Sequence, residues 1–223
     1  MKTLKVFIVL RPLFTKTMIT SERIIAKSAE LFEQKGCKSI TMDEISAVNG
    51  ISKRTLYELF TDKSALLEEC LNYSAEQKRA MSQRLRNESS NVLEYILSFQ
   101  NYESKEAELK SNILIEETRK FFPDVYERTI AKIYKQQIEY TKSLLQEGID
   151  DGLFEKDSGV LGIEAQILAL LVSVGSIAPC ESMRKSATRI DIFKSSVVVF
   201  LKGLSTDKGR RIIDNYFLTK QIK

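Results

Sequence analysis

The sequence of 223 residues contains no histidine and no tryptophan, and only three prolines and nine glycines. Without histidine, the chain lacks the commonest general base, the commonest metal ligand and every nucleophile that depends on an imidazole. The shortage of glycine and proline argues against a sheet protein, whose many turns use these residues, and favours long helices. We therefore expect an all-α protein that is not an enzyme, with no catalytic residues, no metal site and no cofactor.

Cysteine and long hydrophobic runs are also scarce. The three cysteines, Cys37, Cys70 and Cys180, are widely separated and do not have metal-ligand spacing. They are expected to be reduced, buried side chains of a cytoplasmic protein. The longest apolar stretch, residues 167–178, has twelve residues, whereas a membrane-spanning helix needs about 20. This stretch predicts a buried helix and no membrane partner.

The net charge of +4 comes entirely from the N-terminus. Within residues 1–17 there is no acid, and four basic residues occur: Lys2, Lys5, Arg11 and Lys16. The remaining 30 basic residues balance 30 acidic ones, so a nucleic-acid partner has to be argued from local arrangement. Residues 1–17 form an N-terminal extension with two interpretations. Either translation starts at Met18, or the segment is a basic, flexible arm able to reach DNA.

The next part of the chain predicts short, capped helices. A first helix is expected to end at Gly36, which has the position of a left-handed C-cap. Thr41, followed three residues later by Glu44, is a capping box and predicts a second helix that ends near residue 48. Asn49 and Gly50 both tolerate positive φ and predict a sharp turn after it.

A third short helix follows this turn, capped by Ser52 and ending near Phe60. A fourth, with Thr61 or Asp62 as its cap, is expected to continue to about Arg86. Two short helices joined by a tight turn describe a helix-turn-helix, whose second helix lies in the major groove of DNA. The apolar positions expected to hold the two helices together are Ile45, Val48, Ile51 and Leu56.

The polar face of the second of these two helices is then free to meet a duplex. Lys53 and Arg54 lie at its N-terminal end, where side chains reach base edges, and arginine can pair with guanine through two hydrogen bonds. Thr55 and Tyr57 suit contacts with phosphate or with the thymine methyl. The plainer interpretation is a solvated helix end with capping residues. The predicted DNA-binding residues are Thr41, Ser52, Lys53, Arg54, Thr55, Tyr57 and Lys63.

Residues 21–71 resemble the DNA-binding domain of TetR-family (TetR/AcrR-like) transcriptional regulators. The matching landmarks are Leu31-Phe32, Gly36, Thr41 to Ile45, Gly50-Ile51-Ser52, Thr55-Leu56-Tyr57, Phe60 and Lys63 to Leu67. By position, the resemblance implies phosphate contacts at Thr41, Thr55, Tyr57 and Lys63, and base reading at Lys53, Arg54 and Tyr57. The chain departs from the family pattern at Leu59, where His or Tyr is common, at Asn49, where Ala is common, and at Asp43, where some members carry a basic residue.

The resemblance also implies a domain organisation. A three-helix helix-turn-helix domain over residues 18–71 would be joined through a long fourth helix to a helical domain over residues 72–223, which binds an effector and dimerises. Six aromatic residues of the larger domain are candidates for an effector pocket or for ordinary core: Phe99, Tyr102, Phe121, Phe122, Tyr126 and Tyr134.

Two late apolar helices share the spacing i, i+4, i+7, i+8 and i+11. This pattern suits either the core of one chain or a four-helix bundle formed with a second copy. The predicted dimer-interface residues are Ile163, Ile167, Leu170, Leu171, Val174, Phe193, Val197, Phe200, Leu201 and Leu204.

The function predicted from the sequence is a cytoplasmic, homodimeric, sequence-specific DNA-binding transcriptional regulator. We expect a repressor of a palindromic operator in double-stranded DNA, released by a small-molecule effector. The first alternative is a helical dimer that binds a ligand or a protein and has lost operator recognition. The second is an enzyme that uses carboxylates such as Glu116 and Glu117, but adjacent acids on a helix point in different directions.

Overall fold

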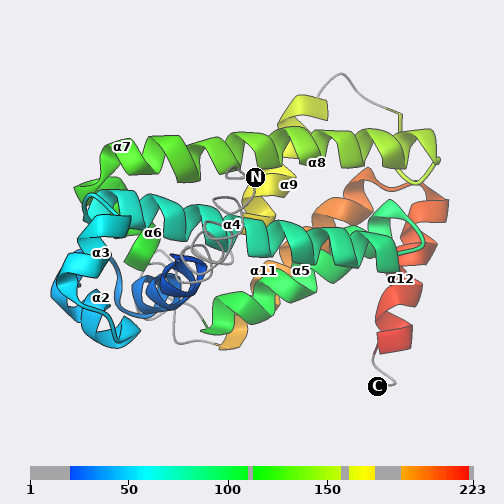
Figure 1. Ribbon diagram of the computed structural model, residues 1–223. Helices are drawn as coiled ribbons and strands as arrows, with labels where there is room; N and C mark the ends of the chain where they lie inside the picture. The colour runs from blue at the N-terminus through cyan, green and yellow to red at the C-terminus, as the bar shows by residue number, and fades with distance from the viewer. Residues whose placement is uncertain (1–20, 110–112, 157–160, 174–186, 221–223) are drawn as a thin grey trace, which may run out of the picture. The chain divides into compact units, whose positions relative to one another are not determined.

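The computed structural model describes residues 21–109, 113–156, 161–173 and 187–220, and within these ranges it is helical. The described residues contain no strand, only a single bridge between Phe154 and Ser205, which confirms the all-α prediction. In chain order the helices are residues 21–35, α2 (Met42–Asn49), α3 (Lys53–Leu59), α4 (Lys63–Glu88), α5 (Val92–Leu109), α6 (Ile113–Phe121), α7 (Pro123–Tyr126), the π-helical segment η1 (Glu127–Ala131), α8 (Lys132–Asp150), α9 (Leu161–Ser173), α11 (Ala187–Leu204) and α12 (Asp207–Lys220) (Figure 1).

The chain divides into two compact units. Unit 1 runs to Gln77 and also includes Ile113–Ile130, whereas unit 2 comprises Lys78–Asn112 and Ala131–Lys223. The sequence had assigned everything after residue 71 to the second domain. The difference arises because α6 and α7 contribute buried apolar side chains to the core of the N-terminal helices.

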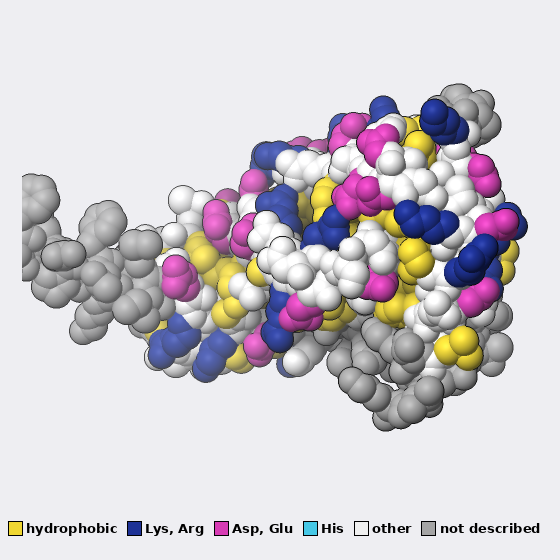
Figure 2. Space-filling view, turned by 90° about the vertical axis from the view of Figure 1, so that its right-hand side faces the viewer, with side chains coloured by type: hydrophobic (Ala, Val, Ile, Leu, Met, Phe, Trp, Pro, Cys, Tyr) yellow, Lys and Arg dark blue, Asp and Glu magenta, His cyan; other side chains and the backbone are white. Residues whose placement is uncertain are grey.

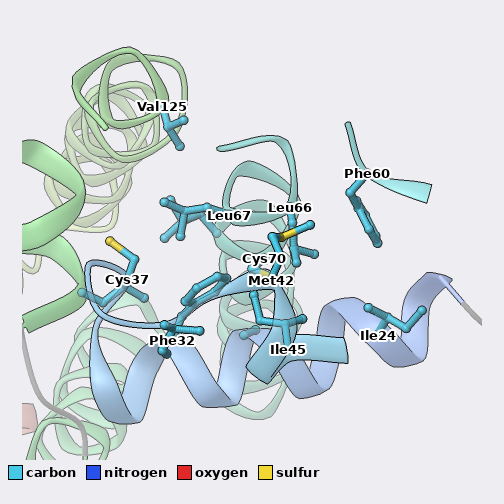
Figure 3. Packing of buried hydrophobic residues seen from close by; sticks show 14 of the residues in the cluster. Ile24, Phe32, Cys37, Met42, Ile45, Phe60, Leu66, Leu67, Cys70 and Val125 are labelled. Atoms are coloured by element: carbon cyan, nitrogen blue, oxygen red, sulfur yellow. The ribbon is translucent and has the colours of Figure 1, made fainter. Parts of the chain in front are cut away.

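The core of unit 1 joins the first helix to α2, α3, α4, α6 and α7. Phe32, Ile45 and Leu56 have no exposed surface. Leu114 from α6 and Val125 from α7 belong to the same buried cluster, and the close-up shows Val125 on the side of Leu67 and Cys37 (Figure 3). Because α2 and α3 are too short to be stable alone, this shared core holds them in place.

Unit 2 has its own core, built from α5, α8, α9, α11 and α12. Val197 and Leu201 on α11 are fully buried within it. Both were predicted to lie in a dimer interface, and that prediction is wrong for these two residues, because the core of their own unit already covers them.

On the face drawn in Figure 2, basic and acidic side chains are interspersed and neither sign gathers into one area. Among the described helices, none combines the length and apolar character that a bilayer crossing requires.

Candidate nucleic-acid interface

The first helix of the predicted helix-turn-helix begins with the expected capping box. The backbone N–H of Glu44 donates to Oγ1 of Thr41 at 3.2 Å, and the backbone N–H of Thr41 donates to Oε2 of Glu44 at 2.8 Å. The pKa of Glu44 is lowered, chiefly by this hydrogen bond from the Thr41 backbone. Two donors that the start of α2 would otherwise leave unpaired are therefore satisfied, and α2 has a fixed beginning.

The turn between α2 and α3 spans Gly50 to Ser52, and Gly50 is its left-handed residue. Its φ of +65° lies in the left-handed region, and its N–H donates to the carbonyl of Ala47 at 3.1 Å. Asn49, expected to share the turn, is instead the last residue of α2 and is buried. Its amide nitrogen donates to the carbonyl of Ile45 at 2.9 Å and to Oγ of Ser28 at 3.3 Å. The side chain thus ties α2 to the first helix.

The apolar contacts between α2 and α3 differ at one position from the prediction. Ile45 and Leu56 are fully buried, and Ile51 packs against the same core. Val48 is 49% exposed, so its predicted role in holding the two helices together is wrong. The inward face of α2 is occupied by Met42, Ile45 and Asn49, at helical spacing, which leaves Val48 on the solvent side.

The helix α3 presents its polar face to solvent, as the sequence predicted. Ser52 caps it, since its Oγ accepts from the backbone N–H of Thr55 at 3.0 Å, and Leu56 anchors it from behind. Lys53, Arg54 and Tyr57 are all exposed, Tyr57 by 45%. None of these three side chains is packed inward, so α3 has the geometry needed to enter a groove.

Both cations on this face are held by carboxylates. Nζ of Lys53 lies 2.6 Å from Oδ1 of Asp43 on α2, and Nε of Arg54 lies 2.9 Å from Oε1 of Glu58, one turn along α3. The hydrogen bond and the negative charge of Asp43 raise the pKa of Lys53. The Arg54–Glu58 pair has the i, i+4 spacing that a sequence can reveal. The Lys53–Asp43 pair depends on how α2 and α3 cross, and no sequence signal predicts it.

Lys63, the predicted phosphate contact at the start of α4, is half-buried. Its Nζ donates to the backbone carbonyl of Lys38 at 3.2 Å and lies 5.6 Å from the ring centre of Phe122. Burial lowers its pKa. Asp62, not Thr61, caps α4, since Oδ1 of Asp62 accepts from the N–H of Ala65 at 2.8 Å.

The six candidate pocket aromatics are divided between the two units. Phe121, Phe122 and Tyr126 belong to unit 1, where the ring of Phe121 lies 4.9 Å from Nζ of Lys38. In unit 2, Phe99 is buried and its ring centre lies 6.3 Å from that of Tyr102; Tyr134 is half-buried in the same unit.

The remaining dimer-interface candidates fall into two groups. Ile163 and Ile167 are exposed, by 58% and 38%, while Phe200 and Leu204 are half-buried. The other four lie outside the residues whose side chains the structure describes: Leu170, Leu171, Val174 and Phe193. In the described part of the chain, no group of histidine, cysteine or acidic side chains is placed to hold a metal ion.

Comparisons with known proteins agree with this geometry. Residues 24–70 match the model of the bacterial regulatory proteins of the tetR family. The chain is 28% identical over 192 residues to the uncharacterised HTH-type transcriptional regulator YvaF of Bacillus subtilis, a match covering 84% of this chain and 96% of that protein. It is 24% identical over 145 residues to the HTH-type transcriptional repressor KstR2 of Mycolicibacterium smegmatis, covering 62% of this chain and 69% of that one.

A solved structure shares the fold over most of its length. A TetR-family transcriptional regulator from Cytophaga hutchinsonii superposes with a TM-score of 0.74 at 17% identity, covering 86% of this chain and 98% of that one. The family match lies on the helices that form the capped helix-turn-helix. Residues 24–70 therefore form a domain that matches the tetR family of bacterial regulatory proteins.

Proposed function

We propose that this protein is a DNA-binding transcriptional regulator that represses its target genes and releases DNA when an effector binds. The observation that carries the proposal is the exposed face of α3. Lys53, Arg54 and Tyr57 share this face, while Leu56 on the opposite side is fully buried. A helix held from behind, with donors at its N-terminal end, suits the major groove, because base edges are read there by such side chains.

Within the groove, the contacts divide into reading and positioning. Arg54 can donate two hydrogen bonds to O6 and N7 of guanine, and Lys53 can donate to the same acceptors. Tyr57, at the middle of α3, is placed to touch a base edge or a phosphate. Thr41 and Lys63, at the starts of α2 and α4, are proposed to contact phosphates and fix the register of α3.

The remaining members of the proposed DNA surface are capping residues. The hydroxyls of Ser52 and Thr55 lie 2.8 Å apart, and Oγ of Ser52 also accepts from the Thr55 backbone. Their mutual hydrogen bond uses one hydroxyl proton, so the other hydroxyl keeps its proton to donate to a phosphate oxygen. We propose that they hold α3 in shape first and contact DNA second.

We propose that the protein acts as a homodimer on a palindromic operator in double-stranded DNA. Two copies related by a two-fold axis would place their α3 helices in successive major grooves, so half-site centres would lie about 34–36 Å apart, or a multiple of that. The exposed Ile163 and Ile167 on α9 support a contact with a second copy, since exposed apolar side chains on one helix face favour association.

An effector could act through α6. The hydroxyl of Thr118 on α6 donates to the carbonyl of Leu114 at 2.6 Å, which leaves the Cys37 thiol as donor in its 3.7 Å contact with Thr118. This contact joins α6 to the segment that precedes α2. A ligand that displaces α6 would disturb the position of α2 and α3, and would thereby weaken binding to an operator of fixed spacing. Because operators lie on the chromosome, we place the protein in the bacterial cytoplasm. We also propose that it has no enzymatic activity.

Footprinting tests the proposal. Purified protein should protect an inverted repeat in the DNA upstream of its own gene, and deleting the gene should raise transcription of the genes beside that repeat. Uniform or absent protection at low salt would contradict DNA recognition and favour the alternative of a ligand-binding helical dimer. Protection together with lower transcription after deletion would identify an activator instead.

A further inference from the structure

The ion pair between Asp43 and Lys53 links the two helices of the helix-turn-helix at their solvent face. Oδ1 of Asp43 lies 2.6 Å from Nζ of Lys53, and the two side chains are 66% and 56% exposed. Lys53 is the first residue of α3 and Asp43 is the second residue of α2. A carboxylate therefore lies on the surface that is proposed to face DNA, in contact with a residue that is proposed to read bases.

The Asp43 carboxylate reduces the favourable free energy that Lys53 gains by contacting a phosphate. Lys53 can donate to a phosphate while it stays paired with Asp43, but the phosphate then lies close to the Asp43 carboxylate. Like charges repel at this distance, so the phosphate contact brings little net gain. Arg54 has a similar constraint, since Glu58 holds its Nε at 2.9 Å. The cations of α3 are thus poorly available to DNA of arbitrary sequence.

A G·C base pair offers the same two groups a better arrangement. An ammonium group has three donors, and Asp43 occupies one, so Lys53 can donate to O6 or N7 of guanine without breaking the ion pair. The second carboxylate oxygen of Asp43 can accept from N4 of the cytosine. At such a base pair the ion pair is kept and both of its members gain a hydrogen bond, whereas on a phosphate the Asp43 carboxylate and the phosphate repel each other.

We propose that Asp43 is a specificity-determining residue, which withholds Lys53 from phosphates and, together with Lys53, favours a G·C base pair in each half-site. This inference rests on the proposed function, since it requires α3 to lie in the major groove. A purely structural role for the pair, in which it only fixes the angle between α2 and α3, predicts a change in stability without a change in salt dependence.

The test measures the affinity of the full-length chain for two duplexes over a series of KCl concentrations. One duplex is the sequence that the wild-type chain selects from a randomised pool, and the other is a scramble of the same composition. With Asp43→Asn, affinity for the scramble should rise about tenfold, and the slope of log Kobs against log[KCl] should steepen by about 0.9, because one more phosphate is neutralised. The preference for the selected duplex should fall about tenfold.

Three controls make the result specific. Glu88→Gln removes another exposed carboxylate, which pairs with Arg84 at 3.0 Å in unit 2, and should leave both affinities unchanged. In a Lys53→Gln background, Asp43→Asn should no longer steepen the slope. Asp43→Ala, which removes the acceptor as well as the charge, should relax the base preference at one position of each half-site, and that position should be G·C. Circular dichroism and thermal unfolding verify that each variant is folded.

The outcomes separate the inference from the function. If the wild-type chain selects a sequence but Asp43→Asn leaves slope and preference unchanged, or weakens both duplexes alike with lower stability, the role of Asp43 is refuted while the regulator stands. If the preference lost in Asp43→Ala lies at an A·T pair, the proposed base readout is wrong. If the wild-type chain selects no sequence, the proposed function fails and the inference fails with it.

Discussion

The carboxylate of Glu117 on α6 accepts a hydrogen bond from the backbone N–H of Lys38 at 2.6 Å, across 79 residues of sequence. Beside it, Gly36 ends the first helix with a φ of +77°, and a Cβ at this glycine would collide with Oε2 of Glu117. The missing side chain at Gly36 therefore serves two purposes. It allows the left-handed backbone, and it lets the carboxylate of α6 reach the turn.

Replacing Gly36 by alanine should destabilise the protein by about 1–3 kcal/mol, because alanine is strained in the left-handed region and displaces the Glu117 carboxylate. Chemical denaturation measures this change in the free energy of unfolding.

Gly203→Ala is the matched control, since Gly203 lies in α11 at an ordinary φ with nothing near its Cβ position. At position 203, alanine should stabilise the folded protein by about 0.5–1 kcal/mol. Added to Glu117→Ala, Gly36→Ala should cost less than it does in the wild type, because the clash with the carboxylate is gone and the backbone strain remains. Equal effects at both glycines would refute this account of Gly36.

Cys37 and Cys70, which are both buried, should resist alkylation in the native protein. Burial raises the pKa of both the Cys37 and the Cys70 thiol, and only the thiolate is reactive. Mass spectrometry after timed exposure to iodoacetamide at pH 8 should show both sites modified slowly in native protein and rapidly in denaturant. Rapid native labelling at Cys37 would mean that the contact of the turn with α6 opens freely.

Acid should weaken the start of α2. The pKa of Glu44 is lower in the folded chain than its ordinary value of 4.5, chiefly because the Thr41 N–H donates to the carboxylate. A carboxyl group with a depressed folded pKa stabilises the fold above its unfolded pKa, and this stability is lost as the pH falls through the folded pKa. Unfolding at pH 7 and at pH 3 should show wild type losing more stability than Glu44→Gln, whose amide caps without titrating. Identical pH profiles for the two proteins would contradict this role.

Arg54 and Lys63 should affect DNA binding in different ways. Arg54→Ala should weaken binding to the selected operator by about 1–3 kcal/mol, with a smaller effect on scrambled DNA, because a bidentate contact with guanine is lost. Lys63→Ala should weaken both duplexes alike and reduce the salt slope by about 0.9, because one phosphate contact is lost. Fluorescence anisotropy over a salt series distinguishes the effect of Arg54→Ala from that of Lys63→Ala. A uniform loss in Arg54→Ala would mean that this residue contacts only phosphates.

Much of the fold follows from local sequence signals. The Thr41–Glu44 capping box and Pro123 at the start of α7 depend on groups a few residues apart, so the sequence predicts them. The burial of Asn49 and the exposure of Val48 depend on which side of α2 faces the first helix. The assignment of α6 to unit 1 depends on contacts such as that of Glu117 with Lys38. Those contacts require a folded chain, and periodicity alone does not reveal them.

The proposed DNA interface also combines features that the sequence predicts with features that depend on the folded chain. The exposed face of α3 could be predicted, because the turn signals and the inward residues Leu56 and Leu59 fix its orientation. The Arg54–Glu58 pair lies one helical turn apart and was visible in the spacing. The Asp43–Lys53 pair was not, since it links two helices through their crossing geometry. The charge available to DNA therefore differs from what the residue types alone suggest.

The most direct test of the account compares two duplexes under the same conditions. Purified full-length protein is titrated, at several KCl concentrations, against DNA from upstream of its own gene and against a scramble of the same composition. We expect the upstream DNA to bind at least about a thousandfold more tightly, with both affinities falling steeply as salt rises. Equal affinity for the two duplexes at every salt concentration would contradict the claim that α3 reads a DNA sequence.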